Sequence, residues 1–271
     1  MSSKYEINKR YKTEKVGEIN TNTQGCQMKI IEYKEAKDII VEFQDNIKYQ
    51  KKTSYNHFLE GKVKNPYFNS VYGVGYLGDI NNINRNAYKT WLNMLRRCYN
   101  EKYKKNNVIT YKDVIVCDEW LCYKNFEKWF DENYYSLGSE TMCLDKDILN
   151  KKSNIYSPQT CLFVPLAIND LFIYKYSQNG MLSGVSYTSN KKKYRARISI
   201  NNKEKFIGSY DNEIDAFNSY IKEKEKNIKT VANKYKQKYP NFPQKLYNAM
   251  CNYKIDISDC RRINESKWFV W

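Results

Sequence analysis

The sequence has a single histidine, no long run of apolar residues, and no low-complexity tract or long internal repeat. No apolar run approaches the roughly 18–20 residues that a membrane-spanning helix needs, so a membrane partner is not expected. The opening segment, MSSKYEINKRYKTEK, is charged and polar, and it predicts no secretory leader. We therefore expect a cytoplasmic protein whose 8 cysteines are reduced thiols.

Four of the cysteines have a spacing that would allow a zinc site. They are Cys117, Cys122, Cys143 and Cys161. However, Cys117 and Cys161 lie in the strand-like runs DVIVC and TCLFV, where a free cysteine commonly packs as a small hydrophobic residue. The pattern therefore does not favour structural zinc.

Acidic residues are too few to balance the basic ones. The 46 Lys and Arg residues stand against 30 Asp and Glu, which gives a formal charge of +16. A polyanionic partner is the usual physical reason for such an excess. The 26 tyrosines interleaved with Lys and Arg suit stacking and phosphate contacts on nucleic acid. The alternatives are a ribosome-associated surface or one that only keeps the chain in solution.

Hydrophobic patterning predicts an α+β protein. Residues 17–70 alternate in short runs (MKIIEY, DIIVEF, KTSYNHF), which predicts three or more strands of a small sheet or barrel. The glycine-rich stretch 71–79, VYGVGYLGD, is interpreted as a hinge and a domain boundary.

A helical period begins near residue 86. Helical spacing relates Ala87, Trp91, Met94, Leu95 and Cys98. YKDVIVCDEW is strand-like, and NFEKWFDENYY predicts a short helix that buries its aromatic residues, Phe126, Trp129 and Phe130.

The next segment, LDKDILNKKSNIYSPQTCLFVPLAIND at 144–170, predicts a strand, a loop, a second strand and a helix. A loop is expected around Ser177–Gly180. The C-terminal residues read first as a helix, at FPQKLYNAMCNY, and then as irregular chain.

Residues 184–209 predict three strands, with a tight turn at Asn201 and Asn202, followed by a helix from about Asn212. Arg195 and Arg197 are two residues apart in a strand and so point to the same face. A cationic ribbon of this kind can enter the major groove of DNA. Further candidate DNA contacts are Lys191, Lys192, Lys193, Lys203 and Lys205, of which the first three form a turn cluster suited to phosphates. A solvated sheet face is the plainer reading.

This segment resembles the APETALA-two/ethylene-response-factor DNA-binding domain found in phage and mobile-element endonucleases. The residues that carry the resemblance are Gly184, Val185, the run Tyr194–Ile198, Ile207, Gly208, Tyr210, Asp211, Ala216 and Tyr220. The resemblance implies a three-stranded sheet backed by one helix that reads duplex DNA.

Residues 86–175 resemble the HNH (His-Me finger, ββα-metal) homing-endonuclease family in its phage form. The matching segments are WLNMLRRCY at 91–99 and VCDEW at 116–120, with Phe126 and Trp129. The resemblance implies phosphodiester hydrolysis with Mg²⁺ or Mn²⁺.

Carried over by position, Asp145 and Asn169 take the metal-ligand places, and Lys146 stands where the family has its general-base histidine. Thr160 falls at the residue that orients the base, and Asn154 is an alternative polar group for that place. The single histidine, His57, lies in the N-terminal region outside any motif. Three explanations stay open: Lys146 acts as the base, Asp147 accepts the proton or adds a carboxylate to the metal, or the site is silent.

The sequence thus predicts four parts: a small β-rich domain at 1–78, an HNH-like nuclease core with flanking helices at 79–180, an APETALA-two-like domain at 181–238 and a helical tail at 239–271. Arg96 and Arg97 are further candidate phosphate contacts. The leading hypothesis is a phage-type endonuclease that nicks or cuts double-stranded DNA and uses no small-molecule cofactor.

The main alternative is a catalytically inactive DNA-binding regulator or decoy, and a further one is an inhibitor that binds RNA or protein. The sequence leaves the oligomeric state open and slightly favours a monomer.

Overall fold

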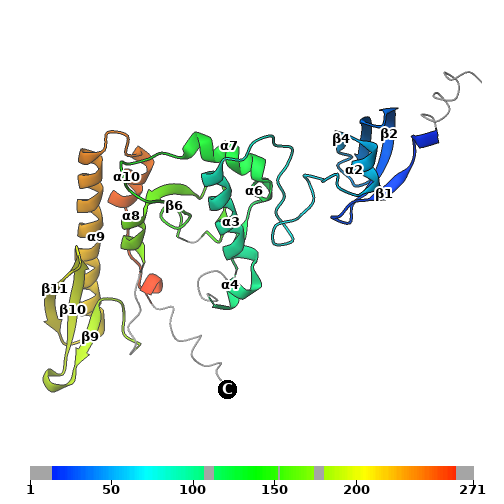
Figure 1. The fold of residues 1–271 in the computed structure, drawn as a ribbon. Helices are drawn as coiled ribbons and strands as arrows, with labels where there is room; N and C mark the ends of the chain where they lie inside the picture. Colours follow the sequence, from blue (N-terminus) through cyan, green and yellow to red (C-terminus); the bar gives the residue numbers. More distant parts are fainter. Residues whose placement is uncertain (1–13, 107–112, 152, 174–179, 261–271) are drawn as a thin grey trace, which may run out of the picture. The chain divides into compact units, whose positions relative to one another are not determined.

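Small sheets and short helices alternate along the chain, which gives a mixed α+β fold (Figure 1). The computed structural model describes residues 14–106, 113–151, 153–173 and 180–260. The predicted loop residues Ser177, Gln178 and Asn179 lie outside these ranges. The chain divides into two compact units, one with residues up to Leu95 and Asp118–Glu127, the other with Arg96–Cys117 and residues from Lys128 on. The four predicted domains do not follow this division, and their boundaries stay predictions.

The first unit contains a four-stranded antiparallel sheet in the order β1-β2-β3-β4. Its strands are β1 Ile19–Thr21, β2 Gln27–Glu35, β3 Asp38–Phe43 and β4 Gln50–Thr53. One face is buried, with Met28, Ile30, Ile39, Val41 and Phe43 at its core, because these residues alternate along β2 and β3. The predicted small sheet is confirmed.

The run KTSYNHF does not continue as a strand beyond Thr53. The hydroxyl of Ser54 accepts a hydrogen bond from the His57 backbone N–H and so begins helix α2, Tyr55–Leu59. Phe58 on this helix is buried against the sheet, whereas His57 is exposed. The strand prediction was wrong here because a local cap competes with sheet pairing.

The glycine-rich stretch packs closely in the first unit and is not an open hinge. A Cβ atom at Gly75 would collide with Leu95 and Trp91 of helix α3, Arg85–Tyr99. Gly78, at φ +74°, lies against Cys122. Gly75 and Gly78 are therefore needed for close approach of the backbone to its neighbours, whereas Gly73 has open space around it.

The predicted helical faces are confirmed. Helix α3 buries Ala87, Trp91, Met94, Leu95 and Cys98, and α4 follows at Glu101–Asn106. In the described part of the strand-like YKDVIVCDEW, from Asp113 on, the strand is the short β5, Ile115–Val116, because α6 occupies Asp118–Leu121. Helix α7, Tyr123–Asn133, buries Phe126, Trp129 and Phe130 as predicted.

The second unit contains the predicted order of strand, loop, strand and helix. Strand β6, Met142–Asp145, pairs antiparallel with β8, Leu162–Pro165, and α8 follows at Leu166–Asn169 with a 3₁₀ turn, η1, at Asp170–Phe172. The loop between the strands contains β7, Ile155–Tyr156, which pairs parallel with β5.

The three strands near the C-terminus form an antiparallel sheet in the order β11-β10-β9. They are β9 Val185–Thr188, β10 Lys193–Ile200 and β11 Lys203–Tyr210. Asn201 and Asn202, at φ +52° and +60°, make the predicted tight turn.

Helix α9, Glu213–Lys238, begins at an Asn212 cap, and it extends beyond the sheet that its first turns cover (Figure 1). Ala216, Phe217 and Tyr220 pack on the sheet. Further along α9, Ile228 and Ala232 join a second core with residues of β8, α8 and helix α10, Gln244–Cys251. The chain ends its described part in η3, Ile257–Cys260. In the described ranges, no helix has the length and apolar character that a membrane crossing requires.

Candidate functional site

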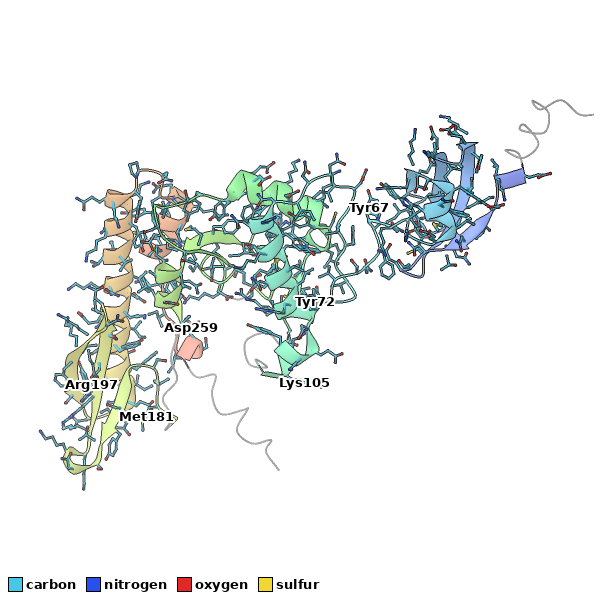
Figure 2. The ribbon with its side chains drawn as sticks, in the orientation of Figure 1. Tyr67, Tyr72, Lys105, Met181, Arg197 and Asp259 are labelled. Atoms are coloured by element: carbon cyan, nitrogen blue, oxygen red, sulfur yellow. The ribbon has the colours of Figure 1, made fainter. Side chains whose placement is uncertain are left out.

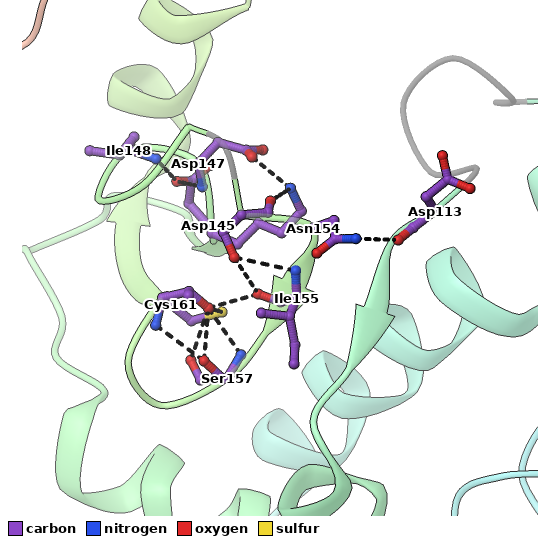
Figure 3. Close-up of polar contacts among 11 residues, drawn as sticks. Asp113, Asp145, Asp147, Ile148, Asn154, Ile155, Ser157 and Cys161 are labelled. Atoms are coloured by element: carbon purple, nitrogen blue, oxygen red, sulfur yellow. Dashed lines mark hydrogen bonds and ion pairs between the residues drawn. The ribbon is translucent and has the colours of Figure 1, made fainter.

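Asp145 is the last residue of β6, and its carboxylate is fixed by the loop that follows. Oδ1 accepts hydrogen bonds from the backbone N–H groups of Asp147 (3.0 Å) and Ile148 (2.8 Å) (Figure 3). This is an Asx turn, which strand-ending Asp residues form readily. Oδ2 receives no hydrogen bond from the part of the chain that the structure describes, so this oxygen is available to a ligand.

Burial raises the pKa of the Asp145 carboxyl to about 6. The backbone N–H of Ile148 opposes this shift, and the negative charge of Asp147 adds to it. The positive charge of Lys146 also opposes the shift but does not cancel the effect of burial, so a carboxylate in this position gains from a further nearby cation.

Lys146 is 7% exposed and committed to two hydrogen bonds. Nζ donates to Asp147 Oδ1 at 2.6 Å and to the Ser153 backbone carbonyl at 3.1 Å. It also lies 6.0 Å from the ring centroid of Tyr156. A general base needs a free lone pair, whereas this nitrogen acts as a donor that holds the loop between the strands closed.

Thr160 stabilises the turn before β8. Its hydroxyl donates to the Ile155 carbonyl at 2.7 Å and accepts from the Ser157 backbone N–H at 3.1 Å. Within the described residues, no hydrogen bond joins Thr160 to Lys146. Asn154 is engaged elsewhere, because its amide donates to the Asp113 carbonyl at 3.1 Å. Neither residue orients Lys146 in this structure.

Asn169 ends α8, is half-buried, and makes no side-chain hydrogen bond to a described residue. Asp170 follows it and was missed in the sequence, although its place beside Asn169 was a usable signal. Burial raises the pKa of the Cys143 thiol to about 11, and Asp145, Arg97 and Asp170 all act on it electrostatically. These three charged residues therefore lie around one point of β6.

Across the described ranges, no three His, Cys, Asp or Glu side chains are grouped as a metal site. Asp145 Oδ2 and the side-chain oxygen of Asn169 are hard oxygen donors that no described residue engages, which suits Mg²⁺ because it is often held by one or two carboxylates and several waters. Of the two candidate arginines, Arg96 stacks at 5.3 Å on Tyr103.

A second candidate site is the outer face of the β9–β11 sheet, opposite α9. Cross-strand partners share a face, so Arg195 lies with Ser186 and Ser209. Arg197, which is labelled in Figure 2, lies with Phe206. Phe206 is 57% exposed. The residues of this reader face are Ser186, Thr188, Lys193, Arg195, Arg197, Ser199, Glu204, Phe206 and Ser209.

Some of the predicted cations are held by carboxylates. Arg197 pairs with Glu204 at 3.0 Å, and Lys193 pairs with Asp211. Lys205 pairs with Glu223 of α9 at 2.6 Å. It lies opposite Ile198 on the neighbouring strand, and Ile198 faces the helix, so Lys205 faces the helix as well. Lys203, opposite Ile200, is on the helix side as well. Among the described residues, Lys191, Lys192 and Arg195 have no ion pair.

A comparison with protein-family models found no match, and comparisons with curated proteins and with solved structures found none either.

Proposed function

We propose that this protein binds double-stranded DNA through the reader face of β9–β11. The observation that carries the proposal is the pair Arg195 and Arg197, which share one exposed face beside serines and the exposed Phe206. This arrangement, backed by α9, is also what the resemblance to the APETALA-two domain implies.

The physical argument rests on size and charge. The β10–β11 hairpin is a two-stranded ribbon of the kind that the major groove admits, and a guanidinium there can donate two hydrogen bonds to a guanine edge. Lys191 and Lys192, in the turn before β10, are placed to contact phosphates without reading sequence. The pairs of Arg197 and Lys193 are exposed, and exposed ion pairs are weak enough to exchange for phosphate.

The test is binding of the full chain to a library of duplexes. Arg195→Gln should lower affinity for selected sequences by about 1–3 kcal/mol and relax specificity. Lys229→Gln, an exposed change on α9 with the same loss of charge, serves as the control. An equal effect of the two substitutions on selected and random duplexes would contradict a reading role for Arg195. Stronger binding to RNA duplexes would favour the RNA-binding alternative.

We infer a second function, metal-dependent phosphodiester hydrolysis at the β6–β8–α8 core, from the donor set at Asp145 and Asn169. A bound Mg²⁺ or Mn²⁺ would neutralise charge on the scissile phosphate. The chain's own part is to hold the Asp145 carboxylate rigidly through two backbone N–H groups and to offer the unengaged amide of Asn169.

Lys146 and Asp147 are the two candidates for the proton-accepting group. Lys146 donates both of its hydrogen bonds, so Asp147 is the better candidate, with its side chain 56% exposed and Oδ1 paired to Lys146. Plasmid cleavage with Mg²⁺ or Mn²⁺ should be lost in Asp145→Ala and Asn169→Ala, and reduced in Asp147→Asn.

A further variant, Lys146→His, places a neutral nitrogen where the resembling family has its base, and it should increase cleavage. Tight DNA binding without cleavage by any of these proteins would instead support the non-catalytic regulator.

A further inference from the structure

A cavity of about 470 Å³ opens in the second unit between three of its elements. Ala167 of α8 and Leu171 of η1 form one side. The tip of the β10–β11 hairpin, at Ser199–Asn201, forms another, and α9 forms the third. The cavity therefore lies between the candidate metal core and the end of the reader sheet.

One stripe of α9 supplies most of the polar lining. Its residues recur at helical spacing and so face the cavity together: Glu223, Lys226, Asn227, Thr230, Val231, Lys234 and Tyr235. The stripe lies where α9 passes the end of the sheet, since the turns before it are covered by β10 and β11.

The charge of the lining is positive. Lys205, Lys226 and Lys234 stand against one carboxylate, Glu223, and Lys205 already neutralises that carboxylate at 2.6 Å. Lys226 and Lys234 are exposed and have no ion pair with a described residue. Glu223 also interacts electrostatically with Lys226, so one carboxylate serves two of the three lysines and the lining keeps an excess of two positive charges.

Neutral donors add to the two lysines. The amides of Asn201 and Asn227 make no side-chain hydrogen bond to the described chain. Asn201 is held at φ +52° by the hairpin turn, which fixes its place at the rim. Ammonium and amide donors around an open cavity are the chemistry that recognises a phosphate.

The lining does not suit a stacked base. Tyr235 is its single aromatic residue, and base-binding surfaces stack each base on an exposed ring. Tyr235 is half-buried, and the rest of the apolar lining is aliphatic.

We propose that this cavity binds a backbone phosphate of duplex DNA, with Lys226 and Lys234 as the charged contacts and Asn201 and Asn227 as neutral donors. The inference rests on the proposed DNA binding and deepens it. It gives the duplex a contact between the reader sheet and the α8 core that carries no sequence information.

The experiment measures the dissociation constant of the full chain for one duplex as a function of salt, from about 50 mM to about 300 mM. The variant is Lys226→Gln/Lys234→Gln. The matched control is Lys222→Gln/Lys229→Gln, which removes the same charge from exposed positions of α9 outside the cavity. Lys226→Gln/Lys234→Gln should reduce the magnitude of the slope of log K against log salt by about 1–2 relative to the wild type. The control should have a slope within a few tenths of the wild-type value.

A second variant separates charge from folding. Asn227→Asp puts a carboxylate into the cavity and should weaken duplex binding by about tenfold. Its thermal unfolding midpoint should match that of the wild type, because Asn227 has no structural hydrogen bond among the described residues.

The outcomes distinguish this inference from the proposed DNA binding on which it rests. No duplex binding by the wild type would overturn both. A different result would overturn the inference alone. In that case the wild type binds the duplex and Arg195→Gln weakens this binding, but Lys226→Gln/Lys234→Gln has the same salt slope as its control. Titration with inorganic phosphate and with a mononucleotide completes the test. If either compound binds tightly in the absence of DNA, and this binding requires Lys226 and Lys234, the cavity is a site for a small anion and the duplex contact is overturned.

Discussion

Lys146 Nζ lies 2.6 Å from Asp147 Oδ1, and the lysine side chain is 8% exposed whereas the aspartate side chain is 56% exposed. The same nitrogen reaches the Ser153 carbonyl at 3.1 Å. A buried ammonium with two acceptors ties the start of the loop between β6 and β8 to Ser153, just before β7. Lys146 is therefore a structural residue in this conformation, at the place where a nuclease of the resembling family has its base.

Removing the Lys146 ammonium should destabilise the protein. Lys146→Met keeps the aliphatic length but leaves the Ser153 carbonyl without its partner, which should cost about 1–3 kcal/mol. Urea unfolding at neutral pH measures the change. Lys229→Met, at an exposed position, should stay within about 0.5 kcal/mol of the wild type. Equal stability of the two variants would show that the loop does not depend on Lys146.

Asp145 should make stability depend on pH with a defined sign. Burial raises the pKa of its carboxyl from 3.8 to about 6, so the folded state keeps a proton that the unfolded state releases between about pH 4 and about pH 6. The Asp145 contribution to the free energy of unfolding is therefore present at low pH and falls as the pH rises through this window.

Asp145→Asn retains an acceptor for the two backbone N–H groups and has no charge to bury. Relative to the wild type, its free energy of unfolding should increase by on the order of 1–2 kcal/mol between about pH 4 and about pH 7. This value is smaller than the full pKa shift would give, because the residue is half-buried and solvent screens its charge. Urea unfolding across this range in a chelating buffer measures the difference. A difference that stays constant with pH would contradict the raised pKa.

Glu204 should weaken DNA binding in the wild type. It pairs with Arg197 at 3.0 Å on the reader face, so Glu204→Gln frees the guanidinium and removes a negative charge from the proposed interface. We expect duplex affinity to increase about two- to fivefold, with the largest effect at low salt. Glu132→Gln, an exposed change of equal charge on α7, is the control. An equal gain in the control would assign the effect to net charge alone.

Gly184 should be one of the least replaceable glycines. It adopts φ +75°, and a Cβ atom there would overlap the ring of Tyr220. Gly184→Ala should therefore cost about 3 kcal/mol or more, since backbone strain and a clash in the core add. Gly25 is the control position, because it has φ +83° and open space around it, so a substitution there causes backbone strain without a clash. Gly25→Ala should cost about 1 kcal/mol in the same thermal or urea unfolding experiment. Similar losses at both positions would contradict a packing role for Gly184.

The sequence by itself determined the elements whose pattern is local. The burial of Trp91 and Leu95 follows from helical spacing, and the sheet of the first unit follows from alternation in β2 and β3. The same holds for the Asn201–Asn202 turn and for the Asn212 cap, because each depends on the preferences of a few neighbouring residues. The same local reading also failed where two local signals competed, as at Ser54.

Only the tertiary structure decided which side chains are free to act. Lys146 and Thr160 were candidate catalytic residues by position, yet both are engaged in hydrogen bonds with residues of the 145–160 loop. Lys205 was grouped with the arginines of β10, but its pairing with Ile198 turns it toward Glu223.

The lysine-lined cavity was invisible in the sequence because it depends on elements from three parts of the chain. The physical reason is general. Helical and strand periods fix which face a residue shares, but whether that face meets solvent, a carboxylate or a core is set by contacts between residues far apart in the sequence.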